Sequence, residues 1–214
     1  MKYHEFQVIP LHGTEKAYEV IELAARSCYQ SKHKIGPGTA ENFCRTLIKN
    51  KHFAMIEHAY QSFEFIVDRG VSHEMVRHRL ASYAQESTRY CNYSKDKFGG
   101  EITIIKPLYQ FTQEQLRRRE ALYRMIEDHY ILETSEGVPP EIARDVLPHS
   151  LKVSIVMTCN FREWRQVLEL RTAKPAHPYI KHVMNKVLDW FMERYPSCFE
   201  DICSLRKLEQ INKV

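Results

Sequence analysis

Glycine is scarce in this chain, and its placement limits which nucleotide-binding folds the chain can form. Only seven of the 214 residues are glycine, and none belongs to a GxGxxG or a GxxxxGK pattern. Those patterns let a backbone approach a pyrophosphate or wrap around a phosphate group. We therefore exclude a Rossmann dinucleotide fold and a P-loop. If the protein binds a nucleotide, side chains and helix termini must hold the phosphate.

The length and polarity of the chain predict one globular domain spanning residues 1–214. A chain of this size can bury one sizeable core, and the sequence shows no repeats, low-complexity tracts or long linkers. No apolar run approaches the roughly 18 residues of a membrane span, and the first residues form no apolar signal core. We expect a cytoplasmic protein without a membrane partner. The net charge of +4 is too mild to indicate nucleic-acid binding by itself.

The histidines and cysteines do not have the spacing of a metal site. His73 and His78 lie five residues apart, whereas a zinc-binding helix places its two histidines four residues apart. None of the six cysteines forms a CxxC pair. We expect reduced thiols that pack mostly as small hydrophobic side chains, and no metal.

The order of helical and strand patterns predicts a mixed α/β fold with a small central sheet flanked by helices. Strands are predicted over 3–9, 59–67, 101–106 and 152–159. Helices are predicted over 15–28, 40–51, 72–80, 112–136, 140–148, 160–170 and 178–195. The predicted N-caps are Thr14, Thr39, Thr112 and Asn160. Alternation in the second strand places Phe63, Phe65 and Val67 on one face.

The segment 77–90, with the sequence RHRLASYAQESTRY, carries the densest concentration of anion-binding side chains. Its guanidinium groups can bind phosphate oxygens in pairs, and hydroxyl groups can complete the site. A solvated basic turn or helix face is the alternative interpretation of Arg77-His78-Arg79 taken alone. The nearby hydroxyl and amide side chains make that alternative weaker, because a merely solvated face has no need of them. They are Ser82, Gln85, Ser87 and Thr88.

This segment resembles the signature of the flavin-dependent thymidylate synthases, in which an RHR triplet is followed after seven residues by a serine. Four further segments resemble motifs of that family in the same order. They are 25–29 (ARSCY), His52 with Glu57-His58, 142–148 (IARDVLP), and Asn160-Phe161-Arg162 with Leu170-Arg171. Five ordered segments are more specific than any one of them. Five positions depart from residues that are common in the family, namely Ala54, Glu74, Ala84, Gln85 and Gln166.

The resemblance implies the thymidylate synthase-complementing protein fold and a reductive methylation of dUMP to dTMP. Methylenetetrahydrofolate would supply the carbon, NADPH the reducing equivalents, and FAD would mediate between them. The family also implies a homotetramer with active sites at its subunit interfaces. No metal and no nucleic acid is implied.

The resemblance also assigns site residues. The residues it assigns to FAD binding are Arg77, His78, Arg79, Gln85, Asn160, Arg162 and Gln166. Substrate binding falls to Glu74, Met75, Val76, Arg77, Gln85, Glu86, Ser87, Thr88, Arg89, Arg144 and Arg171. Arg171 is the expected catalytic residue, because a fixed cation beside the uracil ring stabilises negative charge that develops as carbon 5 becomes nucleophilic. Without the resemblance, Arg171 fits a structural role equally well.

A single-stranded nucleic-acid-binding module is the rival hypothesis from another functional class. In the segment 77–93, arginines are interleaved with tyrosines, and the two types together can grip an unpaired strand. Three acidic residues in the same region, Glu74, Glu86 and Asp96, count against this function, as does the absence of an RRM or KH motif. Binding of FAD is the observation that separates the two hypotheses.

Overall fold

The computed structural model describes residues 1–211, and side chains as far as Ser204. Residue contacts group into two compact units. Unit 1 comprises Met1–Gln7, Phe65–Arg77 and Ala84–Ile155, and unit 2 comprises Val8–Glu64, His78–Tyr83 and Val156–Val214. Each unit is built from three separate stretches of chain, so residues far apart in sequence meet within one unit. That the whole chain forms a single domain stays a prediction.

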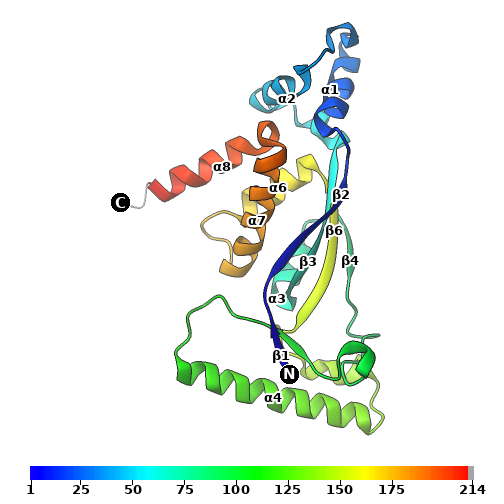
Figure 1. Cartoon of the computed structure of the whole chain (residues 1–214), viewed down its shortest axis with the longest axis vertical. Coiled ribbons are helices and arrows are strands. Elements are labelled where there is room, and N and C mark those ends of the chain that lie inside the picture. The colour runs from blue at the N-terminus through cyan, green and yellow to red at the C-terminus, as the bar shows by residue number, and fades with distance from the viewer. Residues whose placement is uncertain (212–214) are drawn as a thin grey trace. The chain divides into compact units, whose positions relative to one another are not determined.

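The strands form two small sheets. Their bounds are β1 Lys2–His4, β2 Gln7–Gly13, β3 Tyr60–Asp68, β4 Ser82–Gln85, β5 Thr103–Ile105 and β6 Lys152–Asn160. The larger sheet has the order β2-β3-β6-β4, and the smaller one pairs β1 with β5 in parallel register. Figure 1 shows β3 and β6 as the long strands of the larger sheet. The mixed α/β class predicted from the sequence is confirmed.

Eight α-helices and four short 3₁₀ helices connect these strands in the described part of the chain. The α-helices are α1 Ala17–Cys28, α2 Thr39–Lys49, α3 Arg69–Met75, α4 Gln113–Ser135, α5 Pro140–Ala143, α6 Phe161–Arg171, α7 Pro178–Arg194 and α8 Pro196–Ile211. The 3₁₀ helices are η1 Lys32–Lys34, η2 Phe53–His58, η3 Asp96–Phe98 and η4 Arg144–Val146. Among the residues described, no helix combines the length and the hydrophobicity that crossing a membrane requires.

Two of the predicted helix caps are confirmed. The Thr112 hydroxyl accepts a hydrogen bond from the Gln115 backbone amide, and the Gln115 side-chain oxygen accepts one from the Thr112 backbone amide, which completes a capping box for α4. The Asn160 side chain accepts a hydrogen bond from the Glu163 amide at 2.9 Å and caps α6. Asn160 therefore fixes the point at which strand β6 becomes helix α6.

Two other predicted caps are wrong. Helix α1 begins after Lys16, whose backbone is left-handed, and the Thr14 hydroxyl instead accepts a hydrogen bond from the amide of Tyr60, the first residue of β3. Helix α2 follows Gly38, and Thr39 is its first residue, with its hydroxyl bonded to Glu22 on α1. In both cases a threonine binds a neighbouring element rather than its own helix, a competition that local sequence cannot reveal.

Several predicted element boundaries also need correction. The predicted strand 3–9 is two strands, β1 and β2, that belong to different sheets. The predicted helix over 72–80 ends at Met75, and β4 was not predicted at all. Pro196 ends α7 as expected, but it also opens α8, which was missed because proline is well tolerated in the first turn of a helix.

Each unit has its own hydrophobic core. The core of unit 1 centres on Ile102, Ile104, Tyr130 and Leu151, all fully buried. The core of unit 2 is aromatic, with the ring of Phe63 5.2 Å from that of Trp164, and Phe191 stacked on Phe199 at 4.1 Å. The predicted inward face of the second strand is confirmed, because its three apolar residues, Phe63, Phe65 and Val67, are fully buried. Helix α6 is held in this aromatic core by Trp164, whose indole also donates to the Gln61 carbonyl.

Candidate functional site

The signature triplet begins after α3 has ended, in an irregular stretch that leads into β4. Arg77 belongs to unit 1, whereas His78 and Arg79 belong to unit 2. Both arginines are exposed, but the histidine between them is only 7% exposed. The triplet therefore presents two solvated cations and one buried ring, which a uniformly solvated basic face would not do.

His78 binds Arg171 directly. The Arg171 Nε–H donates to His78 Nε2 at 2.9 Å, which joins the first signature segment to the last residue of α6 within unit 2. An imidazole nitrogen that accepts a hydrogen bond carries no proton, so His78 must be neutral, with its proton on Nδ1. Burial, together with the positive charge of Arg171, lowers the pKa of His78 to about 4, in agreement with that state. The structure thus brings together a predicted flavin-binding residue and the predicted catalytic residue.

Two further groups hold the His78 ring and its backbone. Tyr83 O–H donates to the His78 carbonyl at 2.9 Å, which closes the stretch between the triplet and β4. The carboxylate of Glu163 lies 3.9 Å from His78 Nδ1 and is itself buried. Burial raises the pKa of Glu163 above the ordinary range for a glutamate. Arg171 is therefore anchored to a ring whose position is set by several groups of unit 2.

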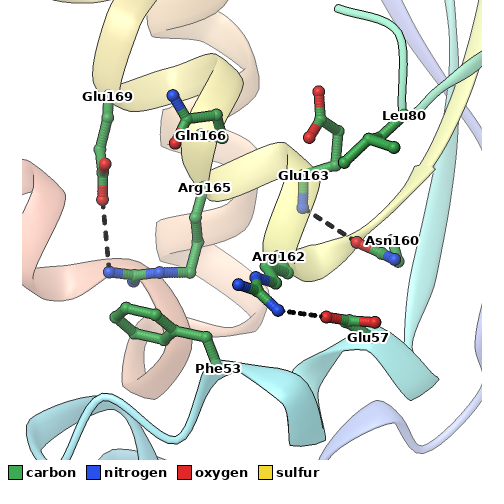
Figure 2. A pocket seen from close by; sticks show the side chains of 9 residues that line it. All are labelled: Phe53, Glu57, Leu80, Asn160, Arg162, Glu163, Arg165, Gln166 and Glu169. Carbon is green, nitrogen blue, oxygen red and sulfur yellow. Dashed lines mark hydrogen bonds and ion pairs between the residues drawn. The ribbon is translucent and has the colours of Figure 1, made fainter.

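A cavity of about 650 Å³ opens at the N-terminus of α6 in unit 2, and Figure 2 shows the side chains around it. It is lined by Phe53, Glu57, Leu80, Asn160, Arg162, Glu163, Arg165, Gln166 and Glu169. Three predicted flavin-binding residues, Asn160, Arg162 and Gln166, thus meet in one place. Asn160 owes its position to its capping hydrogen bond, and the other two project from the first turns of the helix.

The charges around this cavity are already largely paired. Arg162 forms an ion pair with Glu57 from η2, and both side chains are about half exposed. Arg165 binds Asp201 through two hydrogen bonds of 2.8 and 2.6 Å, and it also donates to the Cys198 carbonyl. Burial alone would raise the pKa of Asp201, but the hydrogen bonds and the charge of Arg165 lower it. The cavity thus offers hydrogen-bonding groups of both signs and an aromatic ring, Phe53.

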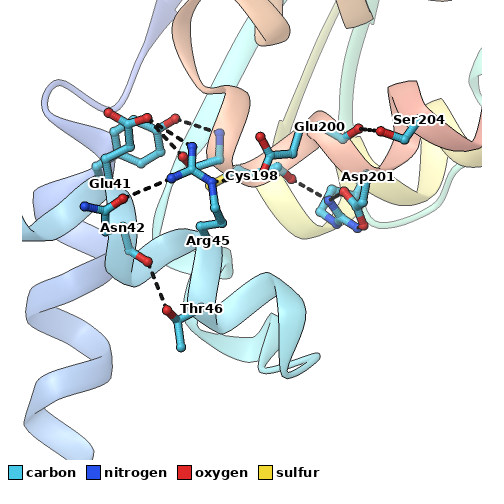
Figure 3. A network of polar contacts seen from close by, with 11 residues as sticks. Glu41, Asn42, Arg45, Thr46, Cys198, Glu200, Asp201 and Ser204 are labelled. Atoms are coloured by element: carbon cyan, nitrogen blue, oxygen red, sulfur yellow. Dashed lines mark hydrogen bonds and ion pairs between the residues drawn. The ribbon is translucent and has the colours of Figure 1, made fainter.

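Arg165 was not singled out by the sequence, and its contacts indicate a structural role. It is 4% exposed and ties α6 to α8, an element that the sequence did not predict. Figure 3 shows the neighbouring polar network, in which Arg45 of α2 binds Glu200 of α8. The only sequence signal for Arg165 was its place on the apolar side of α6, next to Trp164. A buried arginine on that face requires a carboxylate partner, but the sequence does not indicate which carboxylate it is.

A second group of predicted residues meets in unit 1. Arg89 forms an ion pair with Glu141 of α5, and Arg144 Nη1 lies 3.5 Å from the Thr88 hydroxyl. Thr88 is buried, whereas both arginines are exposed. The Ser87 hydroxyl accepts a hydrogen bond from the Arg89 amide at 3.3 Å. The structure therefore brings the segment after β4 against α5 and η4, with the Arg144 guanidinium beside the Thr88 hydroxyl and the Arg89 guanidinium on the Glu141 carboxylate.

The remaining predicted substrate contacts lie elsewhere in unit 1. The carboxylate of Glu86 accepts hydrogen bonds from Tyr93 and Lys152 at 2.7 Å each and from the Ser154 amide at 3.2 Å. Met75 is fully buried at the end of α3, whereas the next residue, Val76, is 41% exposed. Glu74 and Gln85 are partly exposed. Roles in substrate binding stay predictions for all of these residues.

The segment 77–93 of the nucleic-acid-binding hypothesis contains Tyr83, Tyr90 and Tyr93, and of these three only Tyr90 has an open ring. Its side chain is 74% exposed, while Tyr93 is 6% exposed and donates to Glu86. The hydroxyl of Tyr83 is bound to the His78 carbonyl. A stacking platform needs several accessible rings in succession, so the structure gives this rival function little support.

Comparison with known proteins places the chain in a family. Residues 11–197 match the family described as thymidylate synthase complementing protein. A flavin-dependent thymidylate synthase of Corynebacterium efficiens is 30% identical over 211 residues, covering 89% of this chain and 80% of the relative. The flavin-dependent thymidylate synthase of Geobacter sulfurreducens is also 30% identical, over 200 residues, covering 89% of this chain and 84% of the relative.

Two solved structures show that the fold is shared as well. The UMP/dUMP methylase PolB from Streptomyces cacaoi, bound with 5-Br dUMP, has a TM-score of 0.79 at 21% identity and covers 95% of this chain and 97% of that one. Thymidylate synthase X from Helicobacter pylori, with FAD and dUMP, has a TM-score of 0.72 at 23% identity and covers 92% of this chain and 98% of that one. The resemblance found in the motifs is confirmed, and the chain belongs to the thymidylate synthase complementing protein family of flavin-dependent thymidylate synthases.

Proposed function

We propose that this protein methylates dUMP reductively to dTMP, with FAD as its redox cofactor, methylenetetrahydrofolate as carbon donor and NADPH as reductant. The hydrogen bond between His78 and Arg171 carries the proposal most directly. It joins two family motifs that are 93 residues apart in sequence, and it holds a guanidinium group against a neutral, buried ring. Membership of the family supports the same reaction.

The residues of unit 2 fit a flavin nucleotide. A cavity of about 650 Å³ lies within the usual range of small-molecule sites, about 300–1,000 Å³. Because Arg162 and Arg165 are already paired with carboxylates, the cavity suits hydroxyl groups and heterocycle edges better than a phosphate. We therefore assign Asn160, Arg162 and Gln166 to an uncharged part of FAD. We assign the pyrophosphate of FAD to the exposed cations of the signature triplet, Arg77 and Arg79.

FAD, when bound, supplies the electron transfer between the reductant and the carbon donor. The chain itself binds and orients the substrate. Arg89 and Arg144 would hold the phosphate of dUMP, with Ser87 and Thr88 as further hydrogen-bonding partners. Arg171 would lie against the uracil carbonyls, where a cation stabilises the negative charge that develops as carbon 5 becomes nucleophilic. Its anchoring to His78 restricts its rotamers, so less ordering is needed when the substrate arrives.

A product assay tests this function. Purified protein is incubated with dUMP, methylenetetrahydrofolate, NADPH and FAD, each component is omitted in turn, and dTMP is measured by chromatography. We expect dTMP only in the complete mixture, and a slower reaction when UMP replaces dUMP. The comparison with UMP is needed because PolB is described as a UMP/dUMP methylase. Faster turnover of UMP would change the proposed substrate, and no product from either nucleotide would overturn the reaction.

We also propose that the active protein is a homotetramer in which residues of different chains meet in one site. Mixing two inactive variants tests this arrangement, because Ser87→Ala and Arg171→Ala disable different units of the chain. Where active sites are shared, subunit exchange regenerates some intact sites, and activity returns to the mixture. If isotope labelling shows that subunits exchange and the mixture stays inactive, the sites are not shared.

A further inference from the structure

A second cavity, of about 700 Å³, opens beside the first turns of α4 in unit 1. It lies where the end of β1 and the segment between β5 and α4 meet that helix, and in Figure 1 this segment is the green loop that leads into α4. Four aromatic residues contribute to its lining, namely Tyr3, Tyr109, Phe111 and Tyr123. No residue assigned above to FAD or to dUMP lines it. The cavity has the size of a small-molecule site, and the proposed reaction does not use it.

Arg119 and the aromatic rings around it hold the walls of this cavity together. The Arg119 Nη2 group donates to the Tyr123 hydroxyl at 2.8 Å. Its guanidinium carbon also lies 4.7 Å from the centre of the Phe111 ring and 5.6 Å from that of Tyr123, which are distances of cation–π attraction. The Tyr109 ring packs on Phe111 with 4.8 Å between the ring centres. Arg119 therefore fixes the loop that precedes α4 against the helix, and the cavity is formed before a ligand arrives.

Two tyrosine rings in the lining remain open. Tyr3 is 44% exposed, and Tyr109 is 66% exposed although one part of its ring packs on Phe111. An accessible tyrosine ring can stack on a planar aromatic ligand, whichever heterocycle that ligand carries. The cavity therefore offers stacking surfaces for a flat ring.

The three successive arginines of α4, residues 117–119, differ in what they contact. Arg119 is held by the aromatic rings, and Arg118 lies 3.8 Å from Glu114 and does not line the cavity. Arg117 does line it, and its side chain is exposed. Among the residues that the structure describes, Arg117 has no carboxylate partner. One guanidinium group is therefore available to an anion in the cavity.

The acidic residues of the lining already have cationic partners. Glu120 pairs with Arg124 at 2.8 Å, and Glu5 pairs with Lys106 at 3.1 Å. The side chains of Glu5 and Lys106 are both 63% exposed, so their ion pair contributes little to stability and Lys106 can turn to a ligand at little cost. An anion in the cavity would thus meet the free Arg117 and a readily released ammonium group, next to the open rings.

We propose that this cavity of unit 1 is a second ligand site, which binds a planar aromatic ring linked to a phosphate, the chemistry of a nucleoside phosphate. The base stacks on Tyr109 or Tyr3, and the phosphate accepts paired hydrogen bonds from the Arg117 guanidinium, with Lys106 as a further cation. The inference goes beyond the proposed function, because it concerns none of the residues assigned to FAD or dUMP and holds whether or not the protein methylates dUMP.

Calorimetric titration of AMP into the full-length protein, saturated with FAD and dUMP, tests the ligand class. Saturation occupies the sites assigned to those two ligands, so AMP must bind elsewhere. We expect AMP to bind, and adenosine and inorganic phosphate each to bind at least about tenfold more weakly, because each makes only one of the two interactions. No heat from AMP at millimolar concentration, or equal affinity for inorganic phosphate, would overturn the proposal. If the protein binds neither FAD nor dUMP, the same titration without them tests this site independently of the proposed function.

Single variants locate the bound AMP. Arg117→Ala and Tyr109→Ala should each raise the Kd of AMP about tenfold or more, since one removes a charge-assisted hydrogen bond and the other a stacking surface. Arg118→Ala is the matched control, because it removes the neighbouring exposed arginine, which does not line the cavity, and it should leave the Kd unchanged. Circular dichroism verifies that all three variants are folded. Parent-level affinity for AMP in both Arg117→Ala and Tyr109→Ala would place AMP outside this cavity and contradict the proposal.

Discussion

Two arginines of unit 2, Arg171 and Arg165, are held differently from Arg89 of unit 1. In unit 2, Arg171 is bound to a ring that is 7% exposed, and Arg165 is 4% exposed and paired with Asp201. In unit 1, the side chain of Arg89 is 55% exposed and its partner Glu141 is 42% exposed. The guanidinium groups of Arg171 and Arg165 are held by these partners before any ligand arrives, whereas Arg89 can leave its carboxylate at little cost.

The difference indicates that the two kinds of arginine have different roles: one is held in position to act on the reacting ring, and the other binds the incoming phosphate. A cation that acts on a developing charge must already be in place, because reorganisation during the reaction raises the barrier. A cation that captures a phosphate can move, since the ligand itself provides the ordering interaction. The proposed roles of Arg171 at the uracil ring and of Arg89 at the phosphate follow this distinction. Five predictions test it, in order of decreasing effect.

The largest effect is expected for Arg171→Ala. Loss of a fixed donor at a developing negative charge lowers kcat by about 10²–10³-fold in comparable sites. The absorption spectrum of bound flavin should change little, while the spectral change caused by dUMP should disappear. Arg194→Ala, at the exposed end of α7, is the control. Parent-level kcat and dUMP affinity in Arg171→Ala would remove this residue from the site.

Arg165→Ala should instead reduce stability. It leaves Asp201 and the Cys198 carbonyl without their donor, and breaking a buried ion pair costs about 3–5 kcal/mol. Asp201 is 44% exposed, so we expect a loss of about 3 kcal/mol in the free energy of unfolding, at the lower end of that range. Urea denaturation measures it. Arg89→Ala is the comparison and should change the free energy by less than about 0.5 kcal/mol. Equal losses in the free energy of unfolding would show that Arg165 and Arg89 contribute equally to stability.

Arg89→Ala and Arg144→Ala should weaken dUMP binding without loss of stability. Each removes a charge-assisted hydrogen bond to phosphate, worth about 1.5–3 kcal/mol, which corresponds to roughly a 10- to 150-fold rise in Kd. Calorimetric titration of dUMP into the FAD-loaded protein measures the change. Deoxyuridine lacks the phosphate and should bind the variants and the parent equally weakly. Unchanged affinity for dUMP would place the phosphate elsewhere.

Protonation of His78 predicts a dependence of stability on pH. Its pKa falls from 6.5 to about 4 on folding, so between these values the unfolded chain binds the proton more readily. The neutral His78 therefore stabilises the folded protein. Its contribution to the free energy of unfolding is fully present above pH 6.5 and declines as the pH falls toward 4. From pH 7 to pH 5 the loss is on the order of 2 kcal/mol, and His78→Gln should remove that part of the slope. Glu163, whose pKa is raised, acts in the opposite direction, so only the difference between parent and variant isolates His78.

The smallest effects are expected at the cysteines. Burial raises the pKa of Cys91, which disfavours a thiolate nucleophile there, and Cys198 is fully buried, out of reach of a substrate. Cys28 is exposed and has no cation bonded to its sulfur; its thiol lies 3.8 Å from the Ala24 carbonyl. Single changes of Cys28, Cys91 or Cys198 to alanine should keep dTMP formation within about tenfold. A loss of several orders of magnitude in a folded, FAD-loaded variant would imply that a thiol takes part.

Local signals in the sequence pointed to residues that the structure brings together, although their roles in a site stay predictions. The capping residue Asn160 fixed the start of α6, and the motif spacing identified His78, Arg89, Arg144 and Arg171 before their contacts were visible. The capping box of α4 was equally readable, because all of its partners lie within one turn. Periodicity also gave the buried face of β3.

Partners distant in sequence could not be predicted in the same way. Which carboxylate neutralises Arg165 depends on α8, 36 residues further along, and the pairing of Arg89 with Glu141 spans 52 residues. Thr14 and Thr39 were predicted as caps because their local sequence fits, but tertiary partners bind their hydroxyls instead. A single sequence contains the propensity of each element, while the competition between elements is decided only by packing.

Titration of the purified protein with FAD, followed by absorption spectroscopy, tests the central claim most directly. The account predicts a bound flavin spectrum with roughly one FAD per chain, and a perturbation of that spectrum on addition of dUMP, because both ligands are assigned to neighbouring residues of one signature segment. Asn160→Ala, which removes both a cavity contact and the cap of α6, should weaken FAD binding. A folded protein that binds no FAD, or that binds single-stranded DNA tightly instead, would contradict the account.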